Sequence, residues 1–326
     1  MTIETKRAVC EHCHSRCRVL VHSENGRLTS FEEDRSYPLW DRIFPATRGC
    51  ARLLGAKEMA YHPDRVNFPL KRAGERGEGK WQRVSWDEAL DEIAERLEQI
   101  RQKYGAEAVA FTTGTWRTRN FEGRFCNLFG TPNLIGQGKI CFGPFVQTAA
   151  AIFGYPLRPR TAMRIADDST GQKTVTRCIL LTGIDPSQSV LRLWKSLRDA
   201  KKTGYKLIVV DPRETQTAKL ADLWLQLRPG TDTALLMSMI NVIIDEELYD
   251  KEFVDKWCYG FDKLAERAGG YPPEKAAEIT WIPADKIREA ARICGRNKPI
   301  YTLNGMGAFF GVNRPASRSK SATLTD

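Results

Sequence analysis

The sequence has no apolar run long enough to cross a membrane. A spanning helix needs about 18 consecutive apolar residues, and no stretch of this chain approaches that length. The first residues, MTIETKRAV, also lack the apolar core and the twin-arginine pair of an export signal. We therefore expect a cytoplasmic protein with no direct membrane insertion, unless a partner carries it out of the cell.

Runs of like charge and the common nucleotide fingerprint are missing as well. No block of five or six charges of one sign occurs, so a nucleic-acid partner is not indicated. No Gly-x-Gly-x-x-Gly is present, so an ordinary NAD site is not supported. The 326 residues, 42% of them hydrophobic and 28% charged, predict two or three globular domains. The net charge of +10 fits either a solvated basic surface or an anionic partner such as a phosphate-rich cofactor.

Nine cysteines are present, and four of them are spaced as metal ligands. An odd number in a chain without an export signal argues against a disulfide framework. Four thiolates fit a [4Fe–4S] cluster or structural zinc, and the single distal cysteine favours iron and sulfur. Scattered core cysteines are the structural alternative. The four are Cys10, Cys13, Cys17 and Cys50.

Residues beside these cysteines leave two questions open. His12 and His14 lie between the clustered cysteines and keep a zinc site open, because imidazole is a common zinc ligand. Arg52 follows Cys50 by two residues. It is either an ordinary surface arginine or a cation that raises the potential of an anionic cluster and bridges to a second cofactor.

The first half of the chain predicts a hairpin, one clear helix and a long irregular stretch. Val19–Glu24 and Arg27–Glu32 flank Asn25-Gly26, a pair that favours a tight hairpin turn. A capping box at Ser85 starts a helix that ends at Gly105. A loop over 71–80, a buried strand over 108–112 and an irregular stretch over 130–175 complete this half.

The second half alternates strands and helices, which predicts a parallel, doubly wound sheet. The sequence therefore indicates an α/β protein, with a small iron–sulfur β-hairpin module followed by Rossmann-like parallel-sheet domains. We expect strands over 178–182, 207–210, 223–227 and 300–303, and helices over 187–200, 233–245 and 284–294, the last stopped by Gly295. No helix is predicted after the last strand, which indicates an incomplete chain. The predicted divisions are a cluster module over 1–65, an incomplete α/β domain over 66–135, a dinucleotide-binding-like domain over 136–313, and a disordered tail over 314–326.

Several loops could hold a cofactor. Cys141 lies among glycines and a proline, where it is either a soft metal ligand or a small buried hydrophobe. Three further turns follow predicted strands, where free N–H groups and carboxylates meet nucleotides. In the last turn, Asp232 is either the N-cap of the next helix or a guanine contact. The residues of these turns are Gly183, Asp185, Asp211, Arg213, Gly230 and Asp232.

These motifs, in this order, carry a family resemblance that spans nearly the whole chain. The cysteine motif, Cys-x-Gly-Pro at 141, VVDPRETQTAKLAD and LRPGTDTALLMSMINVIIDEELYD are similar to the dimethyl sulfoxide reductase family of molybdopterin oxidoreductases. Within it the chain looks closest to the acetylene-hydratase-like and catechol-dehydroxylase-like branch. The resemblance implies two molybdopterin guanine dinucleotides on Mo or W, with Cys141 on the metal and the four clustered cysteines on the iron. It also implies that Arg52 lies between cluster and pterin, and that the six turn residues hold one dinucleotide.

The resemblance leaves the reaction open. His14 stands where acetylene hydratase carries a catalytic Asp, and Phe142 stands where formate dehydrogenases carry His. The first hypothesis is an oxidoreductase that passes electrons through the cluster, with His14 as a proton donor. The others are a non-redox hydratase or lyase and an inactive metal-binding remnant. The family implies a small-molecule substrate, an iron–sulfur electron-transfer subunit as partner, and a separate chain for the missing carboxyl-terminal half, unless this is a truncated product.

Overall fold

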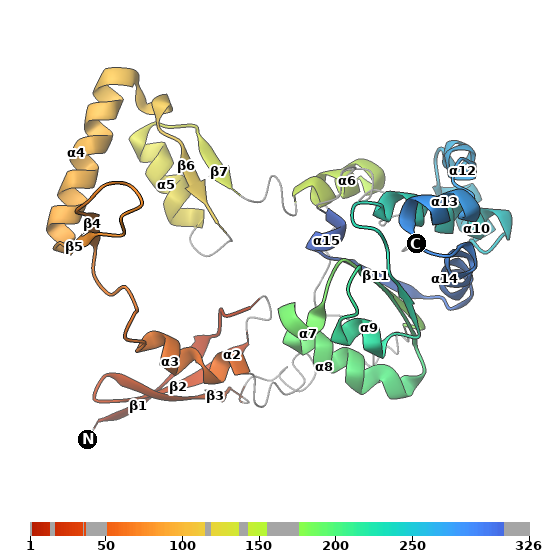
Figure 1. The fold of residues 1–326 in the computed structure, drawn as a ribbon, viewed down its shortest axis with the longest axis horizontal. Helices are drawn as coiled ribbons and strands as arrows, with labels where there is room; N and C mark the ends of the chain where they lie inside the picture. Colours follow the sequence, from red (N-terminus) through yellow and green to blue (C-terminus); the bar gives the residue numbers. More distant parts are fainter. Residues whose placement is uncertain are drawn as a thin grey trace. The chain divides into compact units, whose positions relative to one another are not determined.

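The computed structural model describes residues 2–13, 17–34, 36, 51–114, 119–136, 143–154 and 176–309. The chain divides into two compact units, and Figure 1 colours their elements along the sequence. One unit combines residues 1–54 with 144–326, and the other is formed by residues 55–143. The predicted cluster module and dinucleotide-binding domain thus fall largely in one unit, and the predicted 66–135 domain lies inside the other. The predicted tail over 314–326 lies outside the described residues.

An antiparallel three-stranded sheet opens the first unit. Its order is β1-β2-β3, with bounds β1 Ile3–Val9, β2 Arg18–Glu24 and β3 Arg27–Glu33. The predicted hairpin turn is confirmed, because Asn25 and Gly26 both have positive φ, at 50° and 77°. The sequence did not predict β1, since all its residues are exposed and no alternation of apolar residues marks it.

The predicted parallel sheet is confirmed in the same unit. Four strands pair in the order β10-β9-β8-β11, and every pair is parallel. Their bounds are β8 Cys178–Thr182, β9 Lys206–Val210, β10 Leu223–Leu225 and β11 Ile300–Asn304.

Helices cover both faces of this sheet. Side chains alternate along β8, so that Cys178 and Leu180 join the core under α10, α13 and α14, and Ile179 and Leu181 join the core under α8 and α9. The result is a three-layer α/β/α arrangement. The helices of this unit are α2 Ala51–Leu54, α6 Gly143–Phe153, α7 Pro186–Ser189, α8 Leu191–Ala200, η3 Lys201–Thr203, α9 Gln216–Leu220, α10 Asp232–Asp245, α11 Lys251–Trp257, α12 Phe261–Gly269, α13 Pro273–Thr280, α14 Ala284–Arg296 and α15 Met306–Phe309.

The second unit is thinly packed. Its described residues form two sheets of two strands each, β4 with β5 antiparallel and β6 with β7 parallel. The long helix α4 begins after Ser85, whose hydroxyl accepts the Glu88 N–H at 3.1 Å, and it ends at Gly105 as predicted. Its elements are α3 Ala56–Ala60, β4 Leu70–Arg72, β5 Trp81–Arg83, α4 Trp86–Tyr104, η1 Ala106–Ala108, β6 Phe111–Thr113, α5 Arg119–Phe129 and β7 Leu134–Gly136.

Several predicted elements are corrected by the structure. The strand expected over 108–112 begins at Phe111 and is partly exposed, and the irregular stretch over 130–175 contains β7 and α6. The helix expected over 187–200 is broken at Val190 into α7 and α8. Gly295 does not stop α14, which continues to Arg296. A short helix, α15, follows the last strand, although none was predicted.

Candidate cofactor site

The β1–β2 connection brings the clustered cysteines of the first sheet together. Val9 pairs with Arg18 in the antiparallel register, so Cys10 and Cys17 lie directly beyond the two strand ends. The Cys10 N–H donates to the Cys17 carbonyl oxygen at 2.7 Å, and this bond closes the turn that carries Cys13. The register of the sheet therefore places three half-buried thiols on one short turn.

The fourth predicted cluster ligand, Cys50, lies outside the described residues. His14 and Cys141 lie outside them as well. Within the described ranges no group of three His, Cys, Asp or Glu side chains is arranged to hold a metal ion. The turn with Cys10, Cys13 and Cys17 thus supplies soft ligands of the right kind, but the described residues do not close a cage.

The remaining described cysteines support the distinction between ligands and core residues. None of the seven described cysteines forms a disulfide. Cys126, Cys178 and Cys294 are buried, as structural cysteines are, and the last two belong to a hydrophobic core of the parallel sheet. The three cysteines of the turn differ from them because they are partly accessible and follow one another within eight residues.

Arg52 connects the cluster side of this unit to the parallel sheet. It lies on α2, and its guanidinium donates to the backbone carbonyl of Gln188 on α7. Helix α7 follows β8 directly. Arg52 therefore links the segment after Cys50 to a helix that starts at the edge of the sheet where ligands bind in this fold class.

The order of the strands defines that edge. From β8 the chain moves to β9 on one side, and it later returns to β11 on the other, so the carboxyl ends of β8 and β11 form a topological switch point. Gly183 lies there with a φ of 59°. A Cβ on Gly183 would lie 2.2 Å from the backbone nitrogen of Ala308, so only glycine fits. Its N–H donates to the Val210 carbonyl at 2.9 Å, so this N–H is used within the protein.

Asp185 has a structural role in the same turn. Its carboxylate caps α7 by accepting the Ser187 N–H at 3.1 Å and the Ser187 hydroxyl at 2.7 Å. The Thr217 hydroxyl adds a third bond at 2.6 Å. Sequence reasoning missed Thr217, because nothing in the sequence indicates that α9 reaches back to this turn. With three donors on one oxygen, Asp185 holds the loop in place.

Two buried carboxylates face the same edge after β9 and β10. Asp211 is 5% exposed and accepts the Arg213 N–H at 2.8 Å, while the Arg213 guanidinium lies 3.9 Å from the same oxygen and is mostly exposed. Asp232 is 6% exposed and is the first residue of α10. The N-cap is Thr231, so the capping alternative for Asp232 does not hold.

The environment of Asp232 makes its carboxyl group harder to ionise than an exposed one. Burial, with the nearby Asp211 carboxylate as a smaller cause, raises the pKa of Asp232 to about 6. Gly230, with a φ of 84°, turns the chain immediately before it. Two carboxylates at this edge can accept hydrogen bonds from a ribose hydroxyl or from the N–H groups of a base.

Comparison with known proteins decides the family. The model of the molybdopterin oxidoreductase family matches residues 65–325, and the model of the molybdopterin oxidoreductase Fe4S4 domain matches residues 3–52. The chain belongs to the molybdopterin oxidoreductase family. The predicted resemblance is thereby confirmed. The cofactors of this chain are a [4Fe–4S] cluster and a molybdopterin that carries Mo or W.

Individual members of the molybdopterin oxidoreductase family match along most of this chain. Acetylene hydratase of Syntrophotalea acetylenica is 38% identical over 90% of the chain and 39% of its own length. Dimethyl sulfoxide reductase DmsA of Haemophilus influenzae is 32% identical over 91% of the chain and 40% of its own length. The solved structure of acetylene hydratase from Pelobacter acetylenicus superposes with a TM-score of 0.78 at 35% identity, covering 98% of this chain and 42% of that one. The chain thus spans about two fifths of the length of these relatives.

The described residues fit the family's cofactors in part. The thiols of Cys10, Cys13 and Cys17 are the ligand type that iron–sulfur clusters require. The carboxylates of Asp211 and Asp232 border the edge of the sheet where the switch point lies, as in a dinucleotide site. Gly183 serves the packing of this edge, because its missing Cβ makes room for the backbone of Gly307 and Ala308.

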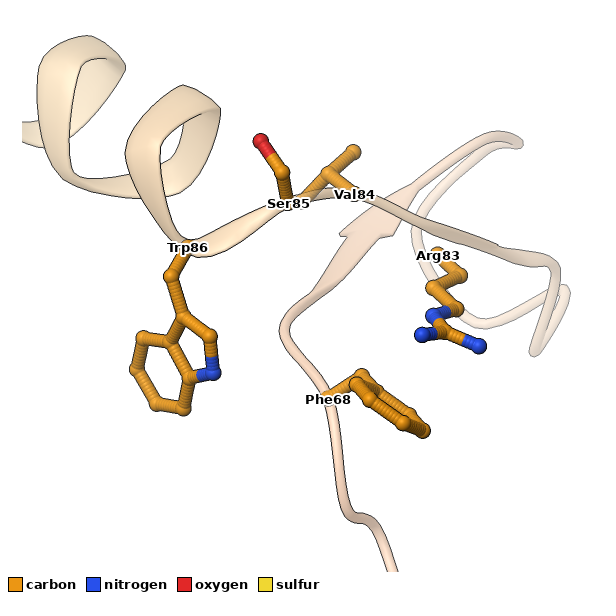
Figure 2. A pocket seen from close by; sticks show the side chains of 5 residues that line it. All are labelled: Phe68, Arg83, Val84, Ser85 and Trp86. Atoms are coloured by element: carbon orange, nitrogen blue, oxygen red, sulfur yellow. The ribbon is translucent and has the colours of Figure 1, made fainter.

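A pocket in the second unit is separate from all predicted site residues. It has a volume of about 440 Å³ and is lined by Phe68, Arg83, Val84, Ser85 and Trp86 (Figure 2). The Arg83 guanidinium lies 3.3 Å from the centroid of the Phe68 ring. The described residues that line it include no carboxylate, cysteine or histidine, so they offer an apolar, cationic surface.

Proposed function

We propose that this chain forms the cluster-bearing part of a molybdenum or tungsten oxidoreductase. The observation that carries the proposal is the contact of Arg52 with Gln188, because it joins the segment after the iron–sulfur motif to the switch point of the dinucleotide-binding sheet. Cys10, Cys13, Cys17 and Cys50 would ligate the cluster. Cys141 would ligate the metal.

The other predicted residues would hold and orient the cofactors. Asp211 and Asp232 would accept hydrogen bonds from a guanine dinucleotide, while Arg213, whose guanidinium is mostly exposed, would meet its phosphates. Gly183, Gly230 and Asp185 would shape the loops, and His14 would donate a proton. When bound, the metal supplies two-electron chemistry at an open coordination position, and the cluster passes single electrons. Two dinucleotides, a small-molecule substrate and an iron–sulfur electron-transfer subunit are parts of this proposal.

A hydratase is the second candidate. It is favoured by the 38% identity to acetylene hydratase, whose name describes the addition of water. In that case the metal would act as a Lewis acid. Turnover that requires an external electron acceptor or donor supports the oxidoreductase, and turnover without one supports the hydratase.

Metal analysis of anaerobically purified protein tests the proposal. We expect about four iron atoms per chain together with Mo or W. Cys17→Ser should lower the iron content and abolish the cluster absorbance. Cys258→Ser, an exposed cysteine outside the motif, is the matched control and should change neither. One zinc ion per chain without pterin would overturn the proposal and would indicate a metal-binding remnant instead.

Further polypeptide, in the same chain or in a separate one, would complete the fold. About 60% of the length of these relatives lies outside the part that this chain matches. In the second unit, helix α4 has no buried residue, although apolar side chains follow one face of it. Leu90 and Ile93 are 57% and 55% exposed. We propose that the remaining part of the family fold packs on this face.

No helix in the described part of the chain is long and apolar enough to span a bilayer. A cytoplasmic location stays a prediction.

A further inference from the structure

Trp281 has a backbone conformation that tryptophan rarely adopts. It is the C-cap of α13 with a φ of 64°, in the left-handed region where helices usually place glycine. Its ring is 68% exposed, so the side chain is not held in this conformation by burial in the core. Strained backbone positions cluster at sites where proteins bind ligands, so this exposed ring is a candidate ligand contact.

The position of Trp281 in the fold is the ligand-binding edge of the parallel sheet. Helix α14 leads into the amino end of β11, so it begins at the carboxyl edge, and Trp281 precedes it by three residues. The Arg228 N–H donates to the carbonyl of Thr280 at 2.8 Å. This bond joins the end of α13 to the turn from Arg228 to Asp232.

A cation lies over the exposed ring. The Arg228 guanidinium is 5.2 Å from the centroid of the Trp281 ring, and Arg228 is itself exposed. An indole and a planar guanidinium are both groups on which nucleic-acid bases stack. Both come from segments that adjoin Asp232.

We propose that Trp281, with Arg228, is a stacking surface for the base of the nucleotide whose hydrogen bonds are accepted by Asp211 and Asp232. This inference rests on the proposed function, because it assumes a guanine nucleotide at this edge. Carboxylates select the edge of a base but contribute little to its faces. An exposed indole supplies the missing face and stabilises the base against exchange with water.

Substitution by glycine tests this directly, because glycine is the residue that the backbone of position 281 favours. The full chain is produced in a host that cannot attach guanine nucleotides to pterin, and guanosine diphosphate is titrated as the probe. Trp281→Gly should keep its far-ultraviolet circular dichroism and bind the probe about tenfold more weakly. Trp281→Phe keeps a ring and should lose much less affinity.

Two controls separate the inference from the proposed function. Trp257→Gly removes a tryptophan that is 77% exposed at the end of α11, and it should not change probe affinity. Asp211→Asn should weaken binding if the nucleotide site exists at all. Unchanged affinity in Trp281→Gly alongside weakened binding in Asp211→Asn would overturn the stacking surface alone. Failure of the unsubstituted chain to bind the probe would overturn both.

Discussion

Asp232 shows how one buried carboxyl group makes stability depend on pH. Its side chain is 6% exposed and lies near Asp211, and together these raise its pKa to about 6 from the ordinary value of 3.8. The folded chain therefore binds a proton more tightly at this position than the unfolded chain does. The folded state loses stability as the pH rises from about 4 to about 6, and it stays at the lower level above that.

Asp232→Asn should remove this penalty. At pH 7 we expect the variant, without bound cofactor, to be more stable than the unsubstituted chain by on the order of 2–3 kcal/mol. The difference should shrink as the pH falls towards 4, because Asp232 is then protonated in the folded chain and about half protonated in the unfolded chain. Urea unfolding between pH 4 and 7 measures it. A difference that is constant across this range would contradict the assignment.

Gly183 tests how tightly the switch point is packed. Its positive φ disfavours any side chain, and an added Cβ would also lie 2.2 Å from the backbone of Ala308. Gly183→Ala should therefore destabilise the chain by at least about 3 kcal/mol. Gly204 also has a positive φ but has open space around it, so Gly204→Ala should lose only about 1–2 kcal/mol. Equal melting temperatures of the two variants would show that the close approach is not maintained in solution.

At the scale of elements, the sequence predicted the structures that have strong local signals. The hairpin at Asn25-Gly26, the capped start of α4 and the apolar strands β8 and β9 were all predicted, since turn chemistry and periodicity act over a few residues. The break at Val190 and the continuation of α14 through Gly295 were not. A Cβ on Gly295 would lie 2.6 Å from Leu248, so this glycine serves tertiary packing and not helix termination.

The candidate site was predictable to a similar degree. The cysteine spacing pointed to the turn that the β1–β2 register builds. Asp185 accepts a hydrogen bond from Thr217 in another helix, and the contact of Arg52 with Gln188 joins residues 136 positions apart. Such long-range contacts leave no local trace in a sequence. Apolar side chains also follow one face of α4, and the described residues do not cover that face.

Helix α4 and helix α10 should therefore respond differently to the same substitution. Leu235 on α10 is fully buried, and Leu235→Ala should cost about 2–5 kcal/mol through the cavity it leaves. Leu90 on α4 is 57% exposed, so Leu90→Ala should change the stability of this chain by no more than about 0.5 kcal/mol. Thermal unfolding followed by circular dichroism compares them. A large loss in Leu90→Ala would mean that the face of α4 is already covered in the isolated chain.

At the scale of the whole molecule, the two units differ in how much of their apolar surface is buried. The first unit has two cores on the faces of a four-stranded sheet. Among the described residues, the second has two-stranded sheets, and parallel strands are normally buried on both faces. Large side chains are exposed on both of its main helices, including Trp86 on α4 and Leu128 on α5 at 63% and 85%. The second unit is thus where we propose that further polypeptide packs.

Co-expression with a polypeptide covering the rest of the family fold tests this proposal. The two chains should purify together, because an apolar helix face of this kind supplies the buried centre of an interface. Ile93→Asp places a charge in that centre and should reduce the recovered complex roughly tenfold or more. Trp257→Asp, on an exposed helix of the first unit, should leave the yield unchanged. If Ile93→Asp is recovered in complex as efficiently as Trp257→Asp, the partner does not pack on α4, and the exposed face needs another occupant.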